Sequence, residues 1–139
     1  MAIEFSSHRT SFKLPNPKKT SAWIEKVVKT EKSKIGSLSY VFCSDNYLLR
    51  INQDYLDHDT LTDIITFDYT EPGAKSLEGE IYISIQRVRE NSKKLGVDFS
   101  QELHRVMIHG VLHLLGYGDK SPKEKAEMRR MEEKYLKRY

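Results

Sequence analysis

The chain has 139 residues, of which 38% are hydrophobic and 31% charged, and its formal net charge is +3. These values are typical of one globular domain with a core and a highly charged surface, and the charge permits nucleic-acid binding without requiring it. No apolar run approaches the roughly 20 residues of a membrane span, and the single cysteine, Cys43, excludes an intrachain disulfide. Because one cysteine suits a reducing compartment and the first residues lack a signal-peptide core, we expect a cytoplasmic protein without a membrane partner.

Strands and helices alternate along the first half of the chain. Residues 2–6 alternate in hydrophobicity and predict a short strand, and Asn16-Pro17 predicts the start of a helix. That helix would bury Trp23, Ile24, Val27 and Val28. Its other face is lysine-rich, and is either a solvated surface or a platform for phosphate groups. The lysines of this stretch are Lys18, Lys19, Lys26, Lys29, Lys32 and Lys34.

Gly36 interrupts the pattern, and residues 37–43 then alternate as a second strand. Ser44 or Asp45 can cap the helix that follows, and residues 57–59 are expected to form a polar loop. Further strands are predicted over residues 63–69 and 80–85, separated by a turn at Glu71-Pro72-Gly73 and a loop to Leu77. A helix over residues 88–95 is expected to end at Gly96.

A mostly apolar helix comes next, and its composition predicts that it is buried. Asp98 and Gln101 resemble a capping box at its start. Its polar residues are three, four and four apart and therefore form one stripe, which a hydrated or metal-lined groove would explain. They are Glu102, Arg105, His109 and His113. A last helix begins with Ser121, Pro122 and Glu124 and has an inner seam of Met128, Met131 and Tyr135. These elements predict an α+β fold, with a small mixed sheet of about four strands and about five helices.

Residues 109–119 carry a candidate metal site. His109 and His113 are one helical turn apart, so their rings can converge on one ion. Gly116 can end the helix in a left-handed turn, which returns Asp119 to the same point. Two imidazoles and a carboxylate with a fourth position open are typical of a catalytic zinc ion. Nickel or another late transition ion could use the same ligands.

The same stretch resembles the signature of the YbeY family of endoribonucleases, His-Gly-x-Leu-His-Leu-x-Gly-Tyr-Asp-His. Residues 51–67 and 79–81 resemble two further family blocks, in the same order along the chain. Three departures stand out: Gly118 replaces the signature's aspartate, Asp119 replaces the third histidine, and Leu56 replaces an arginine thought to serve catalysis. The positions that match the signature are His109, Gly110, Leu112, His113, Leu114, Gly116 and Tyr117.

The resemblance implies one metal-dependent hydrolase domain over residues 1–139. Its implied activity is zinc-dependent cleavage of single-stranded RNA in ribosomal RNA processing and ribosome maturation. The implied partners are ribosomal RNA and the small ribosomal subunit or its proteins, and no DNA partner is expected. One Zn²⁺ would be held by His109, His113 and Asp119. Thr66 would contact the substrate. From its place on the polar stripe, one turn before His109, Arg105 could partly replace the charge that Leu56 lacks.

Several residues keep more than one interpretation. Asp63, like Thr62, belongs to a block that lines the family's site, but it could equally cap a loop, which is the interpretation that we prefer. Gly110 could allow a close approach of the sheet or of a substrate backbone, or serve simple helix packing. Glu80 could act as a base or have a structural role. Neither His58 nor His104 is expected to be a ligand.

Two other functions are compatible with the pattern. One is a metallopeptidase, although Gly110 stands where helical zinc peptidases need a glutamate as general base. The other is a non-catalytic ribosome-assembly factor in which the metal only stabilises the fold.

Overall fold

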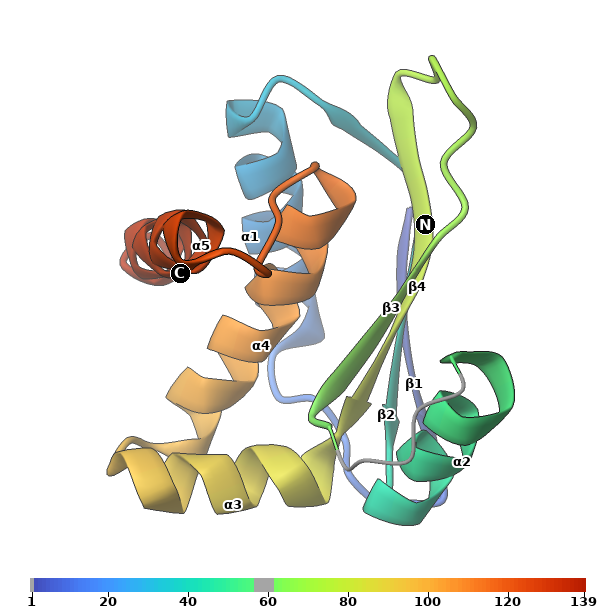
Figure 1. Cartoon of the computed structure of the whole chain (residues 1–139), viewed down its shortest axis with the longest axis vertical. Helices are drawn as coiled ribbons and strands as arrows, with labels where there is room; N and C mark the ends of the chain where they lie inside the picture. Colours follow the sequence, from blue (N-terminus) through green and yellow to red (C-terminus); the bar gives the residue numbers. More distant parts are fainter. Residues whose placement is uncertain (1, 57–61) are drawn as a thin grey trace.

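Four strands form one mixed sheet (Figure 1). Their bounds are β1 Ile3–His8, β2 Lys34–Cys43, β3 Ile64–Asp68 and β4 Ser76–Ser84. The order across the sheet is β1-β2-β4-β3, with β2 parallel to both neighbours and β3 antiparallel to β4 at one edge. The computed structural model describes residues 2–56 and 62–139.

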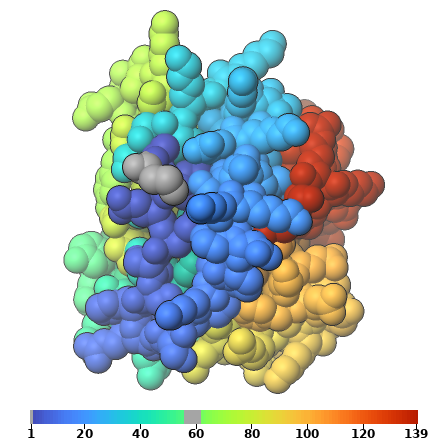
Figure 2. All heavy atoms as spheres, turned by 180° about the vertical axis from the view of Figure 1, so that it is seen from behind, coloured from blue at the N-terminus to red at the C-terminus, as the bar shows by residue number. Residues whose placement is uncertain are grey.

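Helices cover both faces of this sheet. Their bounds are α1 Pro17–Thr30, α2 Asp45–Leu56, α3 Ile85–Leu95, α4 Phe99–Leu114 and α5 Pro122–Leu136. Helices α1, α4 and α5 lie on one side of the sheet and α2 on the other, whereas α3 crosses one end (Figure 1). Seen from behind, β1 and α1 form much of the surface, with α5 beside them (Figure 2). None of the helices in the described residues has the length and apolar character that crossing a bilayer requires.

The main core lies around α4, between the sheet and the outer helices. The Tyr40 hydroxyl of β2 donates a hydrogen bond to the carbonyl of Met107 at 2.8 Å and so fixes α4 on the sheet. Trp23 of α1 donates to the carbonyl of Tyr135 in α5 at 2.9 Å. The other face of the sheet packs on α2 through a smaller core of Cys43, Leu48, Ile51 and Ile65. Helix α4 is therefore strongly apolar because the sheet and the outer helices contact it on nearly every side.

Gly110 allows α4 and the sheet to approach closely. A methyl group at this position would lie 2.9 Å from Cδ1 of Ile81 and 3.0 Å from Cδ1 of Ile64. Both contacts belong to the sheet, and Gly110 is buried. The close approach considered for this residue is therefore made by the sheet and not by a substrate backbone.

The predicted fold class is confirmed, because the structure is an α+β fold with four strands in a mixed sheet and five helices. Element bounds differ in places. Strand β2 begins at Lys34 and passes through Gly36, where a register irregularity between Ile35 and Ser37 absorbs the interruption. Strand β4 begins at Ser76, inside the predicted loop. The predicted loop over residues 57–59, with His58, lies outside the described residues.

Helix starts were predicted with mixed success. Ser121 and Glu124 form the predicted capping box of α5 in both directions. Asp98 is the N-cap residue of α4, but its side chain makes no capping hydrogen bond, so the box predicted there is wrong. Gly96 and Gly116 have the left-handed backbone expected of them, with φ of 68° and 106°.

Candidate metal centre

The end of α4 and the turn after it bring His109, His113 and Asp119 together. The Nε2 atoms of the two histidines are 3.0 Å apart. Asp119 Oδ2 lies 3.2 Å from Nε2 of His113 and 3.5 Å from Nε2 of His109. Gly116 makes this possible, because its positive φ reverses the chain directly after the helix. The convergence predicted from the sequence spacing is thus present in the geometry.

The triangle of these three atoms fits one metal ion. Zinc ligands in a tetrahedral site lie about 2.0–2.2 Å from the ion, which places neighbouring ligand atoms about 3.3 Å apart. The three separations of 3.0, 3.2 and 3.5 Å bracket that value. His109 and His113 are half-buried and the Asp119 side chain is 42% exposed, so one side of the cluster remains open to solvent. His109, His113 and Asp119 could therefore hold one ion with a position left for water or substrate.

A buried carboxylate from α5 orients the first histidine. Glu132 is 4% exposed, and its Oε2 lies 2.5 Å from Nδ1 of His109. Arg105 donates from Nη1 to Oε1 of the same carboxylate at 3.1 Å. Because a carboxylate paired with Arg105 only accepts hydrogen bonds, Nδ1 of His109 donates, and the lone pair of Nε2 faces the cluster. Histidines that bind a metal through one ring nitrogen commonly donate the N–H of the other to a carboxylate in this way.

Sequence reasoning missed Glu132, although a signal for it exists. The residue lies four positions after Met128 and three before Tyr135, both on the buried face of α5. A carboxylate on the apolar seam of a helix requires a buried partner. That spacing would have marked Glu132 as different from its exposed neighbour Glu133.

Arg105 is held by two carboxylates. Besides Glu132, it binds Glu102 through Nε at 2.8 Å and through Nη2. Glu102 is 1% exposed. These hydrogen bonds, those to Glu102 first, raise the pKa of Arg105 against the opposing effect of burial. The guanidinium is therefore charged, but two carboxylates already balance its charge, and the catalytic role predicted for it stays a prediction.

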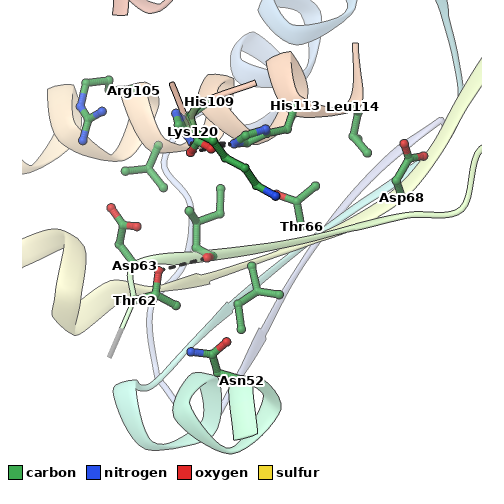
Figure 3. A pocket seen from close by; sticks show the side chains of 14 residues that line it. Asn52, Thr62, Asp63, Thr66, Asp68, Arg105, His109, His113, Leu114 and Lys120 are labelled. Atoms are coloured by element: carbon green, nitrogen blue, oxygen red, sulfur yellow. Dashed lines mark hydrogen bonds and ion pairs between the residues drawn. The ribbon is translucent and has the colours of Figure 1, made fainter. Parts of the chain in front are cut away.

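The cluster opens into a pocket of about 900 Å³ between α4 and β3 (Figure 3). Thr66, the predicted substrate contact, lines its wall together with Thr62 and Asp63. Asn91 donates to Asp63 at 3.4 Å, and burial raises the pKa of the Asp63 carboxyl, although the charges of Arg105 and His109 oppose this. Asp63 therefore lines the pocket, and its role there stays a prediction.

The turn that carries Asp119 is tied to a distant helix end. The Tyr117 hydroxyl donates to Oε1 of Glu31, just after α1, at 2.7 Å. This bond, together with burial and the charge of Glu31, raises the pKa of Tyr117 to about 12. Glu31 also accepts a bond from the Tyr135 hydroxyl of α5. The turn therefore has a fixed position relative to α1 and α5.

Other candidates lie elsewhere. His104 stacks on Tyr139, with ring centroids 3.9 Å apart, and packs edge-on against Trp23. Glu80 accepts hydrogen bonds from the hydroxyls of Tyr69 and Tyr82, at 2.8 and 3.5 Å. Among the described residues, neither Glu80 nor any lysine of α1 lines the pocket. The lysine-rich helix faces the rear of the molecule (Figure 2).

Comparisons with known proteins agree with this picture. The family model described as Endoribonuclease YbeY matches residues 3–139. A protein named Endoribonuclease YbeY from Amoebophilus asiaticus is 54% identical over 125 residues, covering 90% of this chain and 84% of that protein. A second, from Cytophaga hutchinsonii, is 47% identical over 134 residues, covering 96% and 93%.

Solved structures with a related fold include one from Thermotoga maritima. It is the solution structure of TM1509 from Thermotoga maritima, which is 29% identical, with a TM-score of 0.65. The match covers 97% of this chain and 87% of that one. Together with the family model and the curated relatives, it accounts for nearly the whole of the chain. On these grounds the chain belongs to the YbeY family of endoribonucleases.

Proposed function

We propose that this protein is a zinc-dependent endoribonuclease that cleaves single-stranded RNA during ribosomal RNA processing and ribosome maturation. Family membership supports cleavage of RNA. The single observation that carries the metal dependence is the triangle of Nε2, Nε2 and Oδ2 atoms, whose 3.0–3.5 Å sides match a tetrahedral ligand set. Residues 1–139 would act as one domain, in the cytoplasm, with the small ribosomal subunit or its proteins as partners.

His109, His113 and Asp119 would hold the ion. When bound, zinc supplies Lewis acidity toward a phosphoryl oxygen and lowers the pKa of a bound water. Glu132 keeps the His109 ring in the orientation that offers Nε2 to the ion. The carboxylate of Asp119 reduces the net positive charge of the site relative to three neutral imidazoles. The metal centre would therefore be a weaker Lewis acid than that of a three-histidine relative.

The pocket wall would position the RNA. The Thr66 hydroxyl can donate a hydrogen bond to a phosphate oxygen beside the metal cluster, whereas the Thr62 hydroxyl already donates to the carbonyl of Ile64 at 3.3 Å. RNA carries its own nucleophile, the 2′-hydroxyl, so the site needs positioning and charge stabilisation more than a strong external base. Asp63 lies in the wall where it could accept a proton. Arg105 would hold the Glu132 carboxylate in place behind the metal cluster.

The test uses purified protein with measured zinc content and three substrates: labelled single-stranded RNA, the same sequence as a duplex, and casein. Cleavage of the single strand alone is expected, and both a chelator and His113→Ala should abolish it. His104→Ala is the matched control, because His104 lies on the same helix outside the pocket. Cleavage of casein would instead identify a peptidase. No cleavage, with zinc that only raises the melting temperature, would identify a structural metal.

A further inference from the structure

Only two cationic side chains line the described part of the pocket, Arg105 and Lys120. Arg105 is engaged by the carboxylates of Glu102 and Glu132 through three of its nitrogen atoms. A phosphate approaching it would meet a group whose charge is already compensated. Leu56, at the position of the family's arginine, carries no charge. A side-chain cation that contacts a phosphodiester in addition to the metal ion must therefore come from elsewhere in the pocket.

Lys120 differs from Arg105 in its exposure and in its ion pairing. It follows Asp119 directly and is exposed. No carboxylate of the described residues forms an ion pair with its ammonium group. In Figure 3 its side chain runs from beside His109 across the pocket, in the direction of Thr66 on β3. The ammonium group is thus available for an anion between the metal cluster and the opposite wall.

The backbone of Lys120 is held in place. Its N–H donates to Oε1 of Glu124 at 3.2 Å, and the N–H of Ser121 donates to the same oxygen at 3.0 Å. A side chain at Gly118 would meet this carboxylate, because a Cβ there would lie 2.3 Å from Glu124 Oε2. Gly118, where the family signature has aspartate, thus leaves room for the contact. The lysine side chain starts from a fixed point, next to the candidate third ligand.

The other charged side chains of the pocket favour a cation in addition to the metal ion. Three carboxylates, Asp63, Asp68 and Asp119, line the described wall. They repel a phosphate group, and a lysine ammonium with three N–H donors can offset that repulsion. We propose that Lys120 binds the RNA phosphate next to the scissile bond, and so supplies the charge that Leu56 and the paired Arg105 do not. This inference rests on the proposed function, since it takes RNA as the substrate.

The experiment compares Lys120→Met, Lys120→Arg and a control, Lys123→Met, which removes an exposed lysine of α5 outside the pocket. Binding of a short single-stranded oligonucleotide with 2′-O-methyl riboses, which cannot be cleaved, is measured by anisotropy at several salt concentrations. Lys120→Met should bind about 10- to 100-fold more weakly, as expected for a lost charged hydrogen bond. Its slope of log affinity against log salt should fall by about 0.7, the value for one phosphate contact on a single strand. Lys120→Arg and the control should bind like the unmodified protein.

Zinc content and cleavage of unmodified RNA are measured on the same samples. Lys120→Met should retain its zinc and lose cleavage in proportion to binding. Affinity and salt slope equal to those of Lys123→Met would overturn the inference, and so would an equal loss in Lys120→Arg. A loss that appears only together with loss of zinc would also overturn it, because the effect would then belong to Asp119. Absence of RNA cleavage by the unmodified protein would instead reject the proposed function, whereas the oligonucleotide arm still tests Lys120.

Discussion

Replacement of Glu132 by glutamine should weaken metal binding without unfolding the protein. The side chain is 4% exposed and accepts from His109 at 2.5 Å and from Arg105 at 3.1 Å. Glutamine keeps the size but offers one oxygen to two donors. Its amide group must therefore face either the His109 N–H or the Arg105 N–H, donor against donor. In either case the imidazole loses part of the restraint on its orientation and all of the carboxylate's negative charge.

The magnitude follows from the bond that is lost. A hydrogen bond to a charged group contributes about 1.5–3 kcal/mol. Loss of a carboxylate behind a ligating histidine typically costs about 10- to 100-fold in metal affinity, or about 1.4–2.8 kcal/mol. The two figures agree, and we expect Glu132→Gln to bind zinc about 10- to 100-fold more weakly.

Competition with a chromogenic chelator measures this affinity directly. Glu133→Gln is the matched control, because it makes the same substitution at the next, exposed position of α5. Thermal unfolding without metal checks that both variants fold. If Glu132→Gln binds zinc within a factor of two of the control, then Glu132 does not act on the metal through His109, and the reasoning is refuted.

Three further predictions concern stability. Gly110→Ala should destabilise the protein by about 1 kcal/mol in urea unfolding. Crowding of the new methyl group against Ile81 outweighs the gain in helix propensity, which is about 1 kcal/mol. A net gain in stability would contradict this. Burial, with the charge of Lys19, lowers the pKa of His104 below its ordinary 6.5. As the pH drops below about 6.5, the unfolded chain takes up a proton at His104 before the folded protein does, so the stability of the folded protein falls. The melting temperature of His104→Gln should therefore fall less between pH 7 and pH 5 than that of the unmodified protein, and parallel curves would contradict the assignment. Ser121→Ala removes the capping hydrogen bond of α5 and should cost about 1 kcal/mol in the same urea assay, an expectation that an unchanged midpoint would reject.

Local signals in the sequence predicted much of the fold. Gly96, Gly116 and the Ser121 capping box each act within one helical turn, and each has the predicted effect. The Asp98 box failed because the same residue pattern is compatible with a cap that makes no side-chain bond. Strand bounds were less accurate, since pairing with neighbours carries β2 through Gly36. Register across a sheet depends on residues far apart in the chain.

The candidate site also has residues that local sequence signals predict and residues that they do not. The convergence of His109, His113 and Asp119 was predictable because helix geometry and one glycine turn determine it. Glu132 was not predicted, because its contact with His109 depends on how α5 docks against α4. The pairing of Arg105 with Glu102 could have been predicted from the sequence, since the two residues are three apart on one helix. The second partner of Arg105, Glu132 on α5, could not have been predicted in this way, although it completes the compensation of the Arg105 charge.

The short span of the candidate ligands, residues 109–119, has a practical consequence. Helix α4 is anchored to the sheet through Tyr40, and the turn after it through Tyr117, so neither depends on the ion for its place. Dialysis against a chelator should therefore leave a scaffold that accepts a different cation on return. Refilling with Co²⁺ would give this site visible absorption bands, and their intensity would distinguish four-coordinate from six-coordinate binding.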